Sequence, residues 1–171
     1  MQKALVLLAL CALSTAALAT PPTSIGRLPE IVSFSVAYVK ELNKSGQFVG
    51  TCMVEAHVPL KAKLYITAND GVIIDGCQRK HQLKLRPGAP FTCKIKGQLQ
   101  KNAEFPTGVN LKLRYRLPMR SLKKLISSGK APYKNKVVRD ESLALIEEIE
   151  TQGKKVREQN RCFLFDGWRE Q

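Results

Sequence analysis

The feature that most constrains this chain is a strict alternation of apolar and polar side chains, repeated in several short runs. The clearest run is 109–116, where Val109, Leu111, Leu113 and Tyr115 alternate with Asn110, Lys112, Arg114 and Arg116. Neighbouring side chains of a β-strand point to opposite faces, so a period of two predicts strands with one face in a core and the other in water. We therefore expect a β domain.

About seven strands are expected between residues 30 and 118, with turn signals roughly every 8 to 12 residues. The predicted strands are 31–38, 48–58, 62–67, 72–74, 82–86, 91–99 and 109–116. Asn69-Asp70-Gly71 is a strong hairpin signal between the third and fourth of them. The predicted fold is mainly β: an antiparallel β-sandwich of immunoglobulin-like architecture over 30–118.

After Pro118 the period changes to that of a helix. Residues 121–127 favour two helical turns, and 140–152 favour a longer helix that acids open and that ends before Gly153. The apolar tail that starts at Cys162 is expected to be held to the domain by that cysteine. One or two C-terminal α-helices are therefore expected, in a helical extension over 119–171 that packs on the sandwich.

The N-terminus predicts export. Lys3, an apolar stretch over 4–12 and small residues at 17–19 are typical of a signal peptide at 1–19, with a retained membrane anchor as the alternative. Residues 20–29 are expected to be a mobile lead. We expect a secreted, extracellular protein, in which Asn43 is either an N-glycosylation site or an unmodified turn residue.

Cleavage of the signal peptide would remove Cys11 and leave four cysteines, so two disulfides are expected. Four cysteines allow three pairings, which spacing alone does not resolve. The parity of the predicted strands favours a bridge between two packed sheets from Cys52 to Cys93, which leaves Cys77 with Cys162. Without a Cys-x-x-Cys motif, or a finger-like spacing of His57 and His81, neither a metal nor a cofactor is expected.

Charge is concentrated in one segment: residues 79–136 hold sixteen Lys or Arg against one acid, Glu104. Such an excess attracts polyanions. If 91–99 and 109–116 pair as a hairpin, their cations share one face with those at the end of 82–86. The predicted anion-binding residues are Lys84, Arg86, Lys94, Lys96, Lys112, Arg114 and Arg116. Their expected partner is an anionic polysaccharide or extracellular matrix; the alternatives are solvated strand faces and pairing with the protein's own acidic helix.

Two other functions fit the sequence. Basic and apolar residues interleave over 117–130, which suits a cationic membrane-active effector of a defence or venom type on an anionic membrane surface. Its predicted contact residues are Leu122, Lys123, Lys124, Leu125 and Ile126, although such a stripe more often packs in a core. A secreted inhibitor or ligand of an extracellular protein would leave no motif.

Neither catalysis nor nucleic-acid binding is expected. The chain has two histidines and no Gly-x-Ser-x-Gly or Gly-rich phosphate loop, and oxidised cysteines would supply no thiolate. Nucleic acid would satisfy the charge, but export and the lack of interleaved exposed aromatic residues disfavour it.

Overall fold

A computed structural model describes residues 28–38, 46–75 and 79–165. The predicted signal peptide, Asn43 and Cys77 lie outside these ranges. The elements in chain order are β1 (Val32–Tyr38), β2 (Gln47–Ala56), β3 (Leu60–Ala68), β4 (Val72–Asp75), β5 (Lys80–Leu85), β6 (Phe91–Leu99), β7 (Thr107–Arg116), α2 (Met119–Ser127), α3 (Lys136–Thr151) and β8 (Val156–Phe165).

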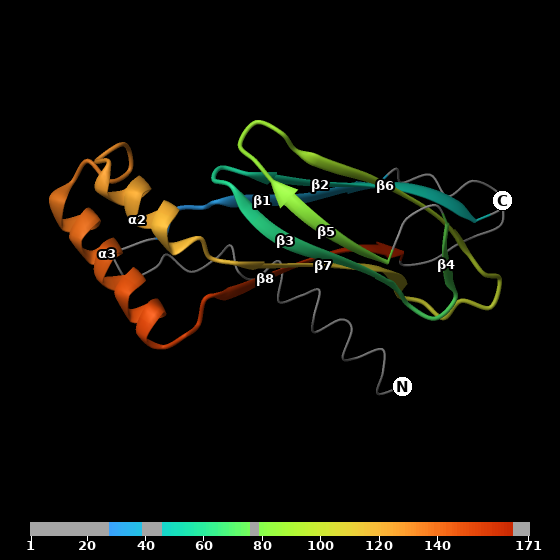
Figure 1. Ribbon diagram of the computed structural model, residues 1–171. Helices are drawn as coiled ribbons and strands as arrows, with labels where there is room; N and C mark the ends of the chain where they lie inside the picture. The colour runs from blue at the N-terminus through green and yellow to red at the C-terminus, as the bar shows by residue number, and fades with distance from the viewer. Residues whose placement is uncertain (1–27, 39–45, 76–78, 166–171) are drawn as a thin grey trace.

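The strands form two four-stranded antiparallel sheets (Figure 1). Sheet A has the order β1-β2-β6-β4 and sheet B the order β5-β3-β7-β8. Phe48 of β2 and Phe165 of β8 meet between the sheets, with ring centroids 4.8 Å apart. This arrangement confirms the predicted mainly β, antiparallel sandwich with C-terminal helices. Its immunoglobulin-like assignment stays a prediction.

The alternation in the sequence sets which side chains enter the core. On β7, Val109, Leu111 and Leu113 are buried, and the residues between them face outward. Gly50 of β2 lies against the Phe163 ring of β8 in the other sheet, and a Cβ on Gly50 would lie 2.5 Å from that ring. The core therefore needs a residue without a side chain opposite this aromatic ring.

The hairpin predicted at Asn69-Asp70-Gly71 is wrong. The turn itself forms, since the Val72 amide donates to the Asn69 carbonyl at 3.1 Å and Gly71 has a φ of +80°. However, β3 belongs to sheet B, whereas β4 pairs with β6 in sheet A. A turn motif fixes a local reversal of the chain, and in a sandwich either sheet can receive the next strand.

Two helices lie side by side beyond one end of the sandwich (Figure 1). The helix expected at 121–127 is α2, and the one expected at 140–152 is α3. Acids do not open α3, because it begins at Lys136, where the Asn135 side chain accepts from the Val137 amide at 2.8 Å. Asparagine is a favoured N-cap residue, so the helix begins before residue 140, where the acidic residues had placed its predicted start.

The last strand, β8, was not predicted: it lies within 119–171, which was expected to be a helical extension. It pairs with β7 along ten positions, from Thr107 opposite Phe165 to Arg116 opposite Val156, and it brings the strands among the described residues to eight, where about seven were expected. Its first half is polar and carries no clear alternation, so only pairing with β7 reveals it. Within the described ranges, neither helix has the length and apolar character needed to cross a membrane.

Candidate anion-binding face

The predicted anion-binding residues divide between the two sheets. Lys112, Arg114 and Arg116 point outward from β7 in sheet B, as Lys84 does from β5. Lys94 and Lys96 point outward from β6 in sheet A, on the opposite side of the sandwich. The predicted hairpin of 91–99 with 109–116 is therefore wrong, because β6 pairs with β2 and β4 while β7 pairs with β3 and β8.

Arg86 lies just beyond β5, in a turn that the Ala89 amide closes by donating to the Arg86 carbonyl at 3.2 Å. It is exposed at the end of sheet B and is not among the residues that line the depression described below.

Sheet B gains three lysines that the sequence reasoning missed, Lys80 on β5 and two on β3. Lys61 and Lys63 point outward from β3, which runs between β5 and β7. The register places Lys61 opposite Lys84 and places Lys63 opposite Arg114. The alternation of Lys61 and Lys63 with Leu60, Ala62 and Leu64 could have placed both lysines on the outward face of a strand. They were missed because they lie in a segment without net charge, outside the basic segment 79–136.

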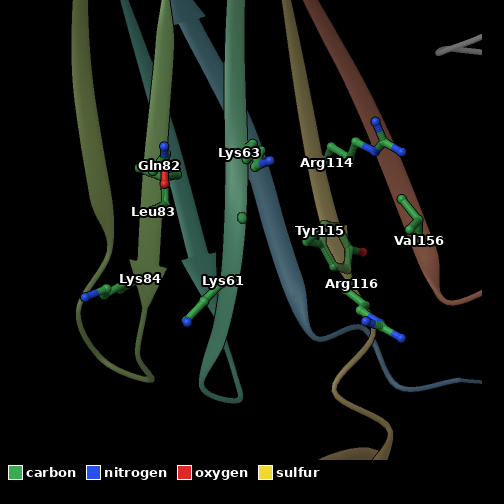
Figure 2. A pocket seen from close by; sticks show the side chains of 10 residues that line it. Lys61, Lys63, Gln82, Leu83, Lys84, Arg114, Tyr115, Arg116 and Val156 are labelled. Carbon is green, nitrogen blue, oxygen red and sulfur yellow. The ribbon is translucent and has the colours of Figure 1, made fainter.

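We call the outward cations of β3, β5 and β7 the basic face. Its members are Lys61, Lys63, Lys80, Lys84, Lys112, Arg114 and Arg116. A depression of about 480 Å³ lies on this face (Figure 2). Five of the ten residues that line it are cations, namely Lys61, Lys63, Lys84, Arg114 and Arg116, and none is acidic.

Glu158 of β8 is the acid that meets the basic face. Its carboxylate lies 3.5 Å from Arg114 Nε and 3.7 Å from Lys112 Nζ. Within the described ranges, no ion pair joins Lys61, Lys63, Lys84 or Arg116 to an acid. Since Lys61 and Lys84 are direct cross-strand neighbours, their like charges oppose folding.

The outer face of sheet A is mixed in character. Lys96 is opposite the exposed Val49 on one side and opposite Asp75 on the other. Lys94 is opposite Thr51. The two β6 lysines therefore belong to a surface with apolar, neutral and acidic neighbours.

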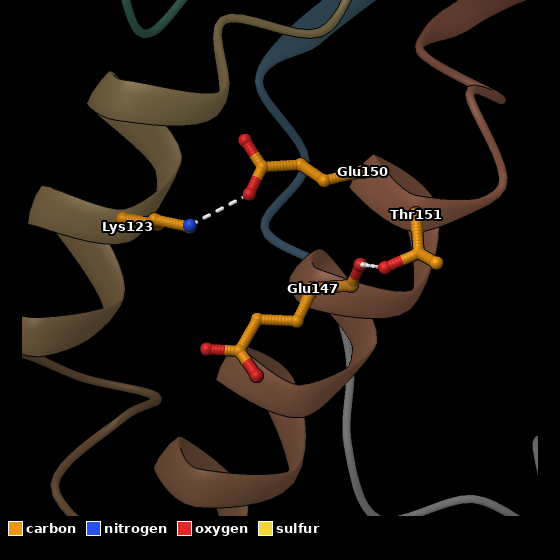
Figure 3. A network of polar contacts seen from close by, with 4 residues as sticks. All are labelled: Lys123, Glu147, Glu150 and Thr151. Carbon is orange, nitrogen blue, oxygen red and sulfur yellow. Dashed lines mark hydrogen bonds and ion pairs between the residues drawn. The ribbon is translucent and has the colours of Figure 1, made fainter.

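Two of the five proposed membrane-contact residues are part of the core. Leu122 and Ile126 have 0% exposure, Leu125 is half-buried, and Lys124 is exposed. Lys123 Nζ donates to the Glu150 carboxylate of α3 at 2.7 Å, which raises the pKa of Lys123 and lowers the pKa of Glu150 (Figure 3). The acidic helix is thus paired with α2, and among the described residues no ion pair joins it to the basic face.

Cys52 and Cys93 do not lie on two packed sheets, as the predicted bridge requires. They are direct neighbours on β2 and β6 of sheet A. Cys52 is a thiol in this structure, and burial first, then the charge of Cys93, raises its pKa to about 12. A disulfide within the sheet stays a prediction, and so does the pair of Cys162 with Cys77.

The described residues contain no group of three or more His, Cys, Asp or Glu side chains that could hold a metal ion. No protein-family model matches the chain, and neither does any curated protein. A solved structure, the FixG-related protein from Vibrio parahaemolyticus, matches with 9% identity and a TM-score of 0.40 over 80% of this chain and 97% of that one.

Proposed function

We propose that this is a secreted, non-enzymatic binding protein whose basic face engages an anionic polysaccharide, free or in the extracellular matrix. One observation carries the proposal: cations of three adjacent strands surround a depression whose lining contains no acid. Five of the seven cations on this face have no ion pair within the described ranges.

The spacing of the cations supports a ligand with repeated charges. Side chains on one face lie about 5 Å apart across neighbouring strands and about 7 Å apart along a strand. A single small anion would contact only part of such an array. A linear polymer with an anionic group on each repeat would contact several cations at once. Because these cations lie on strands of one sheet, their backbone positions are already fixed, and binding would not have to order a loop.

The lining also supports a role in binding rather than catalysis. It contains no carboxylate, histidine or cysteine that could act as a nucleophile or a general base. Apart from its lysines and arginines, the titratable group of the lining is the Tyr115 phenol, and burial raises its pKa. It therefore stays protonated near neutral pH.

Two double variants that remove the same charge from opposite faces test the proposal. Lys61→Ala/Lys84→Ala alters the basic face, and Lys94→Ala/Lys96→Ala alters the outer face of sheet A. On a heparin column, we expect the first variant to elute at clearly lower salt than the wild type and the second to elute close to it.

An equal shift for both variants would show that net charge, and not the basic face, retains the protein. A wild-type protein that heparin does not retain at physiological salt would contradict the proposal. Retention on vesicles of anionic lipid without retention on heparin would instead assign the face to a membrane surface.

A further inference from the structure

The register of sheet B orders the basic face into rows that run across the strands. The first row consists of Lys84 and Lys61, which are paired, and Arg116, which lies beside Lys61 because Ala62 pairs with Tyr115. The second row is Gln82, Lys63, Arg114 and Glu158, and the third is Lys80, Tyr65, Lys112 and Asn160. Only the first row has a cation on each of three strands.

Glu158 occupies the side of the face where the second and third rows meet β8. One carboxylate oxygen is 3.5 Å from Arg114 Nε and the other is 3.7 Å from Lys112 Nζ. The three side chains are 43–53% exposed, so water reaches both contacts. The protein's own carboxylate is thus held between two cations of one strand, in the way that a ligand's anionic group would be.

We infer that Glu158 is a built-in competitor of the ligand, an inference that rests on the proposed function. A linear polysaccharide with sulfate or carboxylate groups docks across the strands along Lys84, Lys61 and Arg116. It gains Arg114 and Lys112 only by displacing the Glu158 carboxylate. Exposed ion pairs of this kind are weak, so the ligand can displace the carboxylate. The free energy needed to break the two contacts lowers the affinity below that of the same face without Glu158.

The direction of the ligand follows from the same positions. Along β3 the outward cations stop at Lys63, because Tyr65 and Thr67 come next. Along β7 there are three cations, but Glu158 holds two of them. The row across the strands offers three cations that have no ion pair within the described ranges.

The test uses Glu158→Gln, with Glu141→Gln as a control of equal charge. Glu141 is exposed on α3 at the helical end and has no ion pair within the described residues. Both full-length variants are titrated with heparin at several salt concentrations. By analogy with counterion release from nucleic acids, two further cation contacts should steepen the slope of log K against log salt by about 1.5 for Glu158→Gln. Glu141→Gln should leave that slope unchanged.

Arg114→Gln, made in both backgrounds, separates local competition from a gain in net charge. With Glu158 present, Arg114 is already held, so its loss should weaken heparin binding little. In the Glu158→Gln background the same substitution should remove much of the gain, because sites that share a contact are not additive. Equal costs in the two backgrounds would overturn the inference.

The failure of the inference is distinguishable from the failure of the proposed function. If wild type binds heparin but Glu158→Gln behaves as Glu141→Gln does, the competitor role is wrong and the proposed function stands. If wild type does not bind heparin, the proposed function itself is wrong, and the competitor role is wrong with it.

Discussion

Replacing Lys84 by glutamine should stabilise the protein while weakening its binding to heparin. Lys84 of β5 is the direct cross-strand neighbour of Lys61 on β3, and both are exposed. Two unit charges about 5 Å apart in water repel each other by about 0.8 kcal/mol. Measured effects of cross-strand charge pairs are about 0.2–1 kcal/mol. Glutamine keeps most of the stem of the side chain and removes the repulsion.

A gain of about 0.5 kcal/mol is therefore expected at low salt, and it should raise Tm by about 1–2 °C in a domain of this size. The assay is thermal unfolding at about 0.02 M and 1 M NaCl. The Debye length falls to about 3 Å at the higher concentration, so the difference between the variant and the wild type should largely disappear there.

Lys94→Gln is the matched control, because the β2 neighbour of Lys94 is the uncharged Thr51. It should not raise Tm at either salt concentration. A lower Tm for Lys84→Gln, or a gain that persists in 1 M NaCl, would refute the idea that the basic face opposes folding. Stability gained where heparin affinity is lost would instead show the trade-off expected of a site kept for binding.

Three further predictions concern the fold. Gly50→Ala should lower the free energy of unfolding by about 1–3 kcal/mol in urea titrations, because its Cβ would lie 2.5 Å from the Phe163 ring; Phe163→Leu should offset part of that loss. Ile146→Ala, at a position of α3 with 0% exposure, should cost about 2–5 kcal/mol in the same assay. In reduced protein, stability should fall as pH rises from about 9 to about 12: the unfolded Cys52 thiol loses its proton near its ordinary pKa of 9.0, whereas the folded one keeps it up to about 12. Protein with a Cys52–Cys93 disulfide should lack that loss, so equal pH profiles with and without reductant would contradict this reading.

The strands and the faces they bury were predictable because alternation is a local signal. The odd residues of 109–116 enter the core as the pattern requires, and both C-terminal helices exist. Pairing was not predictable, since it depends on contacts between distant residues. The turn at Asn69-Asp70-Gly71 forms without a hairpin, and β6 and β7 are consecutive strands that lie in different sheets.

The candidate site was predictable only in part, for the same reason. Lys84, Lys112, Arg114 and Arg116 lie on one face, but the assignment of β6 to sheet A removes its two lysines from that face. Glu158 could not be anticipated, because β8 has little alternation in its polar half and was expected to be part of a helical extension.

The charge of a segment and the charge of a surface are different quantities in a sandwich. Residues 79–136 hold sixteen cations, yet the structure divides them among the outer faces of both sheets, the helices, and the turns and loops between these elements. The centre of the basic face comes instead from Lys61 and Lys63, which lie in a segment where five basic residues balance five acidic ones. Because sheet membership decides which cations converge, variants of this protein are informative when they are matched by face. A series that lowers the net charge step by step would mix surfaces that lie on opposite sides of the molecule.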